Sequence, residues 1–399
     1  MNPLLERLQP YPFERLRDLL AGVEPPEHLA PIALSIGEPC HAPPAFIEAA
    51  LADSLDGLGR YPKTAGDDAL RSTIAGWLEQ RFRLSSGGID PATMVLPVNG
   101  TREGLFSFVQ ACIDPRAESL VMMPNPGYQI YEGAALLAGA TPRYLNTLGV
   151  DGHLPDFPAV PPDEWHRCAL LFLCSPANPT GAVLGRDLLT QAIELADRYD
   201  FMIAADECYS EIYADEAAPP PGLLEVCAEL GRGDFHRCVV FHSLSKRSNV
   251  PGLRSGFAAG DAAALTAFRR YRTYHGCAMG PPIQQASIAA WRDETHVVAN
   301  RELYRQKFDA VLPILSDVLG VARPAGSFYL WARTPIDDQT FCRDLFASQH
   351  VTAVPGSYLS RPTPDGDPGT DYIRLSLVAE LETCVEAARR IRSFCHDLT

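Results

Sequence analysis

The stretch HSLSKRSNVPGLRSGF, residues 242–257, places a lysine and an arginine on either side of a Pro-Gly pair, directly after a short apolar run. Lys246 is one of only three lysines in the chain, and the other two are Lys63 and Lys307. A lysine at the end of a buried strand is partly desolvated, which lowers its pKa and makes the amine a better nucleophile toward a carbonyl group. On residue type alone a surface lysine is the commoner explanation, so the surrounding sequence has to decide.

Five short apolar runs in the middle of the chain predict a buried sheet. They cover residues 119–123, 169–174, 201–205, 238–241 and 256–260. Continuous apolarity is typical of strands that are buried on both faces, as in a parallel sheet covered by helices. Between them, residues 101–113 repeat apolar side chains at the i, i+3, i+4 and i+7 spacing of an amphipathic helix. We therefore predict an α/β fold in which helices sandwich a mainly parallel sheet.

Polar motifs follow three of these runs, at the point where each predicted strand ends. SPANPTG covers residues 175–181, DECY covers 206–209 and SLSK covers 243–246. In an open α/β sheet, ligands bind at the carboxyl ends of the strands. The three motifs should therefore converge on one crevice that contains Lys246.

Residues suited to binding a phosphate group accompany these motifs. Arg254 can hold a phosphate through two parallel hydrogen bonds. Gly100, Thr101 and Arg102 begin the predicted helix, and a helix N-terminus offers backbone N–H groups to an anion. An ordinary alternative exists for this helix start, because Asn99 or Thr101 also serves as a simple cap.

The remaining polar residues complete the requirements of pyridoxal 5′-phosphate. Asp206 is suited to holding a protonated ring nitrogen, although a helix cap or an ion pair would also explain it. Tyr209 and Asn178 are suited to donating hydrogen bonds to a phenolate oxygen, and Tyr128 is placed to stack on the ring. Together with a lysine for the aldehyde, these residues predict this cofactor, which acts as an electron sink for carbanions.

On SPANPTG, DECY and SLSK followed by Arg254, the chain resembles the fold-type I, class I pyridoxal-phosphate aminotransferases over nearly its whole length. The resemblance implies that Lys246 carries the cofactor covalently, that Asp206 pairs with its pyridine nitrogen, and that Tyr209 is a further catalytic residue. It implies that Arg374, in DYIRLSLV, binds the substrate α-carboxylate with help from Gly37 and Asn178. The other cofactor contacts that it implies are Gly100, Thr101, Arg102, Tyr128, Asn178, Tyr209, Ser243 and Arg254, with Tyr61 supplied by the partner subunit of a homodimer with shared active sites.

A narrower resemblance, carried by LQPYPFERLRDLLAG, LPVNGTREGLF and YRTYHGCAMGPP among other stretches, is to the succinyldiaminopimelate aminotransferases of lysine biosynthesis. It implies an exchange of the amino group between glutamate or 2-oxoglutarate and a succinylated partner, N-succinyl-LL-2,6-diaminopimelate or N-succinyl-2-amino-6-oxopimelate. Lys63, Arg102 and Arg272 are candidates for the distal carboxylates. No residue spacing derives a succinyl group, so an aminotransferase for aspartate, alanine or an aromatic amino acid, or a C–S lyase, is an open alternative.

Composition argues against several other classes of protein. A net charge of −15 and a pI of about 5.1 disfavour nucleic-acid binding, and no apolar run reaches the roughly 18 residues of a membrane span. With no signal peptide and no C-x-x-C pair among eleven cysteines, we expect a reduced, cytoplasmic protein. No complete G-x-G-x-x-G supports a nicotinamide oxidoreductase, and no H-E-x-x-H supports a metal site.

The C-terminal part has a different pattern from the middle of the chain. Helical residues 301–319 are followed by strand-like segments at 327–331 and 372–377. We therefore expect three regions: an N-terminal segment at 1–45 that packs with the small domain and the dimer partner, a large cofactor-binding domain at 46–285, and a smaller α+β domain at 286–399.

Overall fold

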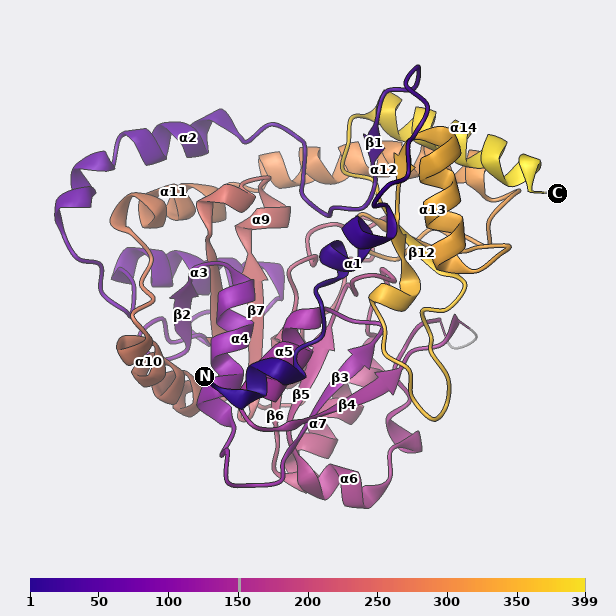
Figure 1. Cartoon of the computed structure of the whole chain (residues 1–399). Coiled ribbons are helices and arrows are strands. Elements are labelled where there is room, and N and C mark those ends of the chain that lie inside the picture. The colour runs from indigo at the N-terminus through magenta and orange to yellow at the C-terminus, as the bar shows by residue number, and fades with distance from the viewer. Residues whose placement is uncertain (150–151, 399) are drawn as a thin grey trace.

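A seven-stranded mixed sheet forms the centre of the computed structural model, which describes residues 1–149 and 152–398 (Figure 1). Its strands are β2 (Val95–Val98), β3 (Leu120–Asn125), β4 (Thr141–Asn146), β5 (Cys168–Cys174), β6 (Met202–Asp206), β7 (Cys238–Ser243) and β8 (Gly256–Gly260). They are arranged in the order β2-β8-β7-β6-β5-β3-β4. The predicted α/β class with a mainly parallel sheet is confirmed.

Side chains along each strand alternate between two cores, one on each face of the sheet. On β5, Leu171 and Leu173 pack into one core, whereas Leu170 and Phe172 pack into the other. The first core includes α2 (Ala45–Ala52), α3 (Asp68–Arg81), α6 (Pro162–Arg167), α7 (Arg186–Tyr199), α8 (Leu223–Glu229) and α11 (Pro281–Arg292). The second includes α4 (Thr101–Cys112), α5 (Gln129–Leu137) and α10 (Ala262–His275). Both faces are covered, which explains the continuous apolar runs in the sequence.

All five apolar runs form strands of this sheet, but the last one runs in the opposite direction. β8 is antiparallel to both of its neighbours, β7 and β2. Only residues 244–255 connect β7 to β8, and they contain nothing longer than the four-residue helix α9 (Leu244–Arg247). A parallel return needs a longer crossover, usually through a full helix, so the chain turns back beside β7. The strands β2 and β4 were not predicted from the sequence, because Pro97 and Arg143 interrupt their apolar stretches.

The antiparallel direction of β8 positions Arg254. Gly256 at the start of β8 pairs with Ser243 at the end of β7 and with Val98 at the end of β2. Arg254 lies two residues before Gly256, and α4 begins shortly after Val98. The predicted phosphate-binding residues are therefore brought to the same edge of the sheet as Lys246.

A second unit is built on a small antiparallel sheet, with α12, α13 and α14 at the upper right of Figure 1. The sheet has the order β11-β12-β9, with β9 (Tyr329–Arg333), β11 (Val354–Pro355) and β12 (Tyr372–Ser376). Its core also contains residues of α12 (Thr295–Leu315), α13 (Asp338–Gln349) and α14 (Leu381–Asp397). The N-terminal segment, which contains α1 (Pro12–Leu19), joins this unit because β1 (Ile32–Ala33) pairs with β10 (Val351–Thr352).

The two hydrophobic cores indicate the position of the boundary between the large domain and the small one. Ala286 and Trp291 of α11 pack with the large sheet, whereas Phe308 of α12 packs with the small one. We therefore propose that the large domain ends between Arg292 and Thr295, after the end of α11, whereas the expected boundary at residue 285 falls inside that helix.

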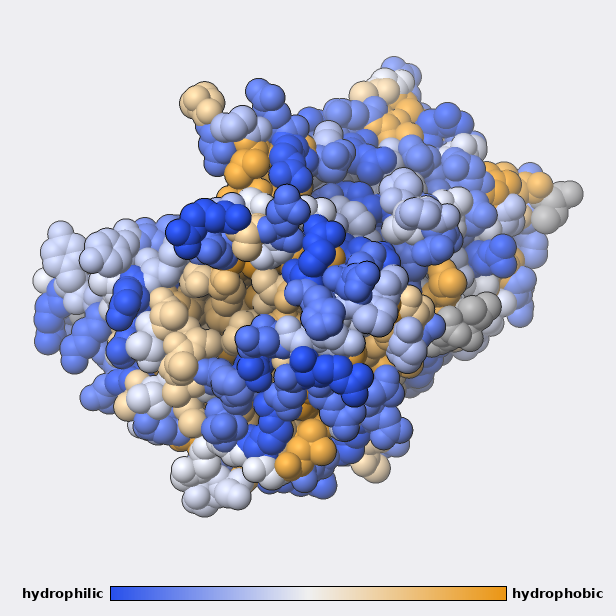
Figure 2. Space-filling view, turned by 90° about the horizontal axis from the view of Figure 1, so that it is seen from below, coloured by the Kyte–Doolittle hydropathy of each residue, from blue (hydrophilic) through white to orange (hydrophobic). Residues whose placement is uncertain are grey.

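Seen from below, the molecular surface is mainly hydrophilic, with scattered hydrophobic patches (Figure 2). Among residues 1–149 and 152–398, no helix combines the length and the apolar character needed to cross a membrane.

Candidate active site

The three polar motifs lie together at the carboxyl ends of β5, β6 and β7, where they line a cavity of about 490 Å³. Segments from the N-terminus, β9 and β12 close the cavity from the side of the small unit. The predicted site residues that line it are Gly37, Thr101, Arg102, Tyr128, Asn178, Asp206, Tyr209, Ser243, Lys246, Arg254 and Arg374. Gly100 caps the start of α4 beside the cavity, and Tyr61 does not line it.

Lys246 lies in α9, immediately after β7, and its amine is in the cavity. The Nζ atom donates a hydrogen bond to the carbonyl oxygen of Gly37 at 2.5 Å. Desolvation lowers the pKa of Lys246 to about 8. More of this amine than of an exposed lysine is therefore uncharged near neutral pH, and the uncharged form can act as a nucleophile or a base.

Asp206, the last residue of β6, presents a buried carboxylate to the same cavity. It accepts hydrogen bonds from the Tyr131 hydroxyl at 2.8 Å and from the Cys208 backbone N–H at 3.3 Å. Burial raises the pKa of Asp206, and within the described chain no lysine, arginine or histidine forms an ion pair with it. An acid in this setting gains stability from a cationic ligand, such as a protonated ring nitrogen.

Arg374, on β12, is the opposite case, a buried cation facing the cavity. Its guanidinium donates to the Asn178 side-chain oxygen at 3.0 Å and to the Ser35 carbonyl at 2.6 Å. Its Nε has no partner, and no carboxylate in the described residues lies within ion-pair distance. Because a guanidinium does not lose its charge in a protein, the site is suited to a ligand carboxylate.

The start of α4 and the turn before β8 form a site suited to a phosphate. Gly100 has a φ of 79°, and a Cβ at this position would lie 2.3 Å from a guanidinium nitrogen of Arg254. Glycine therefore allows Arg254 to approach the N-terminus of α4. The hydroxyls of Ser243 and Ser245 lie 3.0 Å apart and line the same cavity. Backbone N–H groups, a guanidinium and hydroxyls are the usual components of a phosphate site.

Arg102 and Tyr128 are joined by a hydrogen bond at the edge of the cavity. The Nε of Arg102 donates to the Tyr128 hydroxyl at 2.7 Å, and a terminal nitrogen donates to the Tyr11 hydroxyl at 3.1 Å. No acidic residue in the described chain is paired with Arg102. Its guanidinium thus holds Tyr128 in place and retains a donor for an anion in the cavity.

Asn178 and Tyr209 have the donors expected for a phenolic oxygen. Because the Asn178 side-chain oxygen accepts from Arg374, its amide N–H group is left to donate into the cavity. The Tyr209 hydroxyl lies 2.9 Å from the hydroxyl of Tyr329. This second tyrosine was not predicted from the sequence.

Several other cavity residues were also missed. Tyr131 and Cys208 support Asp206, while Ser245, Tyr11 and Phe13 line the cavity wall. Tyr131 carried a usable signal, because it lies three residues after Tyr128 and shares its face of α5. Tyr329 carried none, since it begins an ordinary apolar strand.

The three cations considered for distal carboxylates differ in position. Arg102 lines the cavity, whereas Lys63 is exposed and lies outside it. Arg272 is fully buried, forms an ion pair with Glu103 and donates to the Cys277 carbonyl at 3.2 Å. Arg272 is therefore a structural residue.

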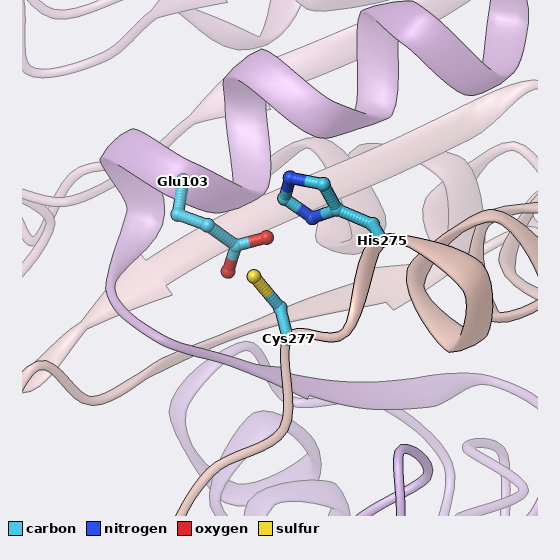
Figure 3. A group of neighbouring side chains, drawn as sticks. All are labelled: Glu103, His275 and Cys277. Carbon is cyan, nitrogen blue, oxygen red and sulfur yellow. The ribbon is translucent and has the colours of Figure 1, made fainter.

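One group of side chains of metal-ligand type lies outside the cavity. The ligand atoms of Glu103, His275 and Cys277 lie within 4.8 Å of one another (Figure 3). The Glu103 carboxylate, however, already binds the Arg272 guanidinium, the Asn99 backbone N–H and the Ser107 hydroxyl. A guanidinium next to the carboxylate repels a cation, so Glu103 pairs with Arg272 instead, and this ion pair anchors α10 to α4.

Lys307 belongs to a buried chain of hydrogen bonds. Its Nζ lies 2.6 Å from Nε2 of His41 and donates to the Val378 carbonyl at 3.2 Å. Nδ1 of His41 lies 2.7 Å from the Asn300 side-chain oxygen, and the Asn300 amide donates to the Lys246 carbonyl at 3.2 Å. Because an ammonium only donates, His41 accepts at Nε2 and donates at Nδ1. Burial lowers the pKa of His41, which keeps it in this neutral form.

The chain is similar to several known proteins over nearly its whole length. Residues 30–391 match the family Aminotransferase class I and II. The LL-diaminopimelate aminotransferase of Desulforudis audaxviator is 33% identical, over 97% of this chain and 96% of the relative. An aminotransferase structure from Neisseria meningitidis is 48% identical with a TM-score of 0.95, covering 99% of this chain and 100% of the other. A Thermus thermophilus protein described as a probable N-succinyldiaminopimelate aminotransferase is 28% identical with a TM-score of 0.84. The match covers 96% of this chain and 99% of the other.

Replacing Lys307 by methionine should destabilise the protein. The change leaves His41 Nε2 and the Val378 carbonyl buried without a donor, so we expect the free energy of unfolding to fall by about 2 kcal/mol. Thermal or urea unfolding of the purified protein measures this. Lys63→Met, at the exposed lysine, is the matched control, and an equal effect of the two changes would contradict the structural role of Lys307.

Proposed function

The chain belongs to the class I and II aminotransferases, which use pyridoxal 5′-phosphate, and we propose that it exchanges an amino group between glutamate and a keto acid of the diaminopimelate type. Curated relatives such as that of Desulforudis audaxviator are named LL-diaminopimelate aminotransferases, which supports the diaminopimelate skeleton. The sequence motifs and the Thermus thermophilus structure support the N-succinylated substrate as the first candidate within this class.

One observation carries the proposal: two unpaired buried charges of opposite sign share a cavity with a lysine of lowered pKa. Asp206 lacks a cation and Arg374 lacks an anion in the described residues. Lys246 lies in the same cavity as both. A cofactor with a ring nitrogen and a substrate with a carboxylate supply the two missing partners, and the start of α4 with Arg254 fits the phosphate.

The residues divide the work of transamination between them. When bound, pyridoxal 5′-phosphate withdraws electrons from the substrate Cα and so acidifies its proton. Arg374 holds the α-carboxylate and fixes the orientation of the Cα–H bond. The Nζ atom of Lys246, uncharged above pH about 8, would take the proton from the substrate Cα and hold it within the cavity. Asp206 keeps a proton on the ring nitrogen by pairing with it, and Asn178 and Tyr209 donate to the phenolic oxygen.

Both substrates use this cavity in turn. Glutamate and the larger keto acid each carry an α-carboxylate for Arg374 and at least one distal carboxylate. Arg102 has no acidic partner among the described residues and lines the cavity, so we assign it to a distal carboxylate. Alternating occupation of one pocket predicts ping-pong kinetics.

The unacylated substrate LL-diaminopimelate is the second candidate, favoured by one residue. Glu38 lines the cavity and contributes a negative charge. An unacylated substrate has a distal ammonium that this carboxylate can bind, whereas the N-succinyl amide is neutral there. Glu38 and Arg102 therefore present one charge of each sign to the distal part of the substrate.

We also propose a homodimer in which Tyr61 enters the site of the partner. Tyr61 is fully exposed in the single chain, and the neighbouring Leu55 and Leu58 are 51% and 72% exposed. Three large apolar side chains on one short segment are typical of an interaction surface. Covering this segment with a second copy of the chain would bury them.

Trapping the lysine–cofactor bond tests the central assignment. Borohydride treatment of the holoenzyme followed by peptide mapping should label Lys246, and Lys246→Ala should take up no label. Attachment of added pyridoxal 5′-phosphate to the apoenzyme should slow about tenfold per pH unit below pH 8 and level off above it, because the uncharged amine is the nucleophile. A label on Lys63 or Lys307 would overturn the assignment.

Steady-state kinetics with matched keto acids separate the substrate candidates. The succinylated keto acid should be preferred over the unacylated and acetylated analogues when glutamate is the donor. Arg102→Gln should raise KM for the preferred keto acid at least tenfold, since a charge-assisted hydrogen bond is lost. Arg198→Gln, an exposed arginine on α7, is the control. Preference for the unacylated compound would select the second candidate, and an unchanged KM would remove Arg102 from the distal site.

Hybrid dimers test the contribution of Tyr61 across the interface. Tyr61→Ala chains and Lys246→Ala chains should each form weak or inactive enzymes. Co-expressed, they should regain activity, because a hybrid contains one site with native Lys246 from one chain and native Tyr61 from the other. No gain over the Tyr61→Ala homodimer would mean that Tyr61 does not act in the partner's site.

A further inference from the structure

Tyr329, the first residue of β9, contacts three parts of the site that have separate roles. It is 2% exposed and lines the cavity. Its hydroxyl lies 2.9 Å from the Tyr209 hydroxyl, and its ring centre lies 4.5 Å from the guanidinium carbon of Arg374. A Cβ at Gly37 would lie 2.0 Å from the same hydroxyl oxygen. One side chain therefore touches the phenolic-oxygen donor, the carboxylate site and the loop whose carbonyl accepts from Lys246.

The hydrogen bond between the two phenols can run in either direction, and an anionic ligand fixes it. Each hydroxyl has one proton, and within the described chain neither has a second partner. An anionic oxygen in the cavity attracts the proton of Tyr209. The Tyr209 oxygen is then free to accept a hydrogen bond, and the Tyr329 hydroxyl donates that bond. Burial raises the pKa of both tyrosines, so both keep their protons over the working pH range.

We propose that Tyr329 is a positioning residue that donates to Tyr209 and so holds the Tyr209 proton toward the phenolic oxygen of the cofactor. This inference rests on the proposed function, because it requires a cofactor joined to Lys246. Hydrogen bonds in series polarise one another, so a donor behind Tyr209 strengthens the bond in front of it. That bond stabilises negative charge on the phenolic oxygen, which lowers the pKa of the coloured lysine–cofactor linkage.

The test is an absorbance titration of the holoenzyme without substrate, which reads the pKa of this linkage and not the activity. Tyr329→Phe removes the donor and keeps the ring beneath Arg374. Tyr304→Phe is the matched control, because Tyr304 is 1% exposed, belongs to the same hydrophobic cluster and has a buried hydroxyl without a hydrogen-bond partner among the described residues. Tyr209→Phe and the Tyr209→Phe/Tyr329→Phe double variant complete a cycle.

Five results are expected. Tyr209→Phe raises the pKa of the linkage most. Tyr329→Phe raises this pKa by about 0.5 unit, as expected for one neutral hydrogen bond that acts indirectly, through Tyr209. The double variant has the same pKa as Tyr209→Phe, because Tyr329 acts through Tyr209. Tyr304→Phe leaves the pKa unchanged. KM for glutamate stays within about twofold in Tyr329→Phe, because Arg374 keeps its aromatic neighbour.

Three results would overturn the inference: no shift in Tyr329→Phe, additive shifts in the double variant, or an equal shift in Tyr304→Phe. A large rise in KM without a pKa shift would also overturn it and would assign Tyr329 to Arg374 instead. Failure of the proposed function itself looks different, because the wild-type protein would then show no titrating chromophore on Lys246.

Discussion

Burying a charge without a partner is unfavourable, and the active site is built around two such charges. Asp206 and Arg374 are each hydrogen-bonded by neutral groups and left without an opposite charge from the described protein. The stability lost by burying each charge is recovered when a cationic ring and a carboxylate bind. The rest of the fold serves to hold these two groups, and Lys246 in the same cavity, in fixed positions.

Strand direction explains how distant segments reach the same place. Asp206 and Ser243 end parallel neighbours, β6 and β7, so both lie at one edge of the sheet. Arg254 precedes β8, and it reaches this edge because β8 is antiparallel. A parallel β8 would have started at the opposite edge and carried Arg254 away from the N-terminus of α4. The single reversal in the sheet is thus what completes the phosphate site.

The sequence predicted the parts that have local signals. Continuous apolar runs located most of the large sheet, and polar motifs at strand ends located the crevice, because both depend on neighbours in the chain. β2 and β4 were not predicted because Pro97 and Arg143 interrupt their apolar stretches. The roles of Tyr329 and Lys307 were not predicted for a different reason, because they come from contacts with residues over a hundred positions away. The reversal of β8 was missed although the short connection from β7 would have indicated it.

The contact between Gly37 and Tyr329 also bears on how related sequences can differ. A side chain at position 37 would overlap the phenol, so a relative with a residue larger than glycine there requires either a smaller residue at position 329 or a displaced loop. The two positions lie in different segments of the chain, nearly 300 residues apart, yet the space available to a side chain at one depends on the residue at the other. Across relatives they should change together, and a relative that replaces the glycine alone should have a displaced loop, and with it a displaced backbone carbonyl at the position that receives the amine of Lys246.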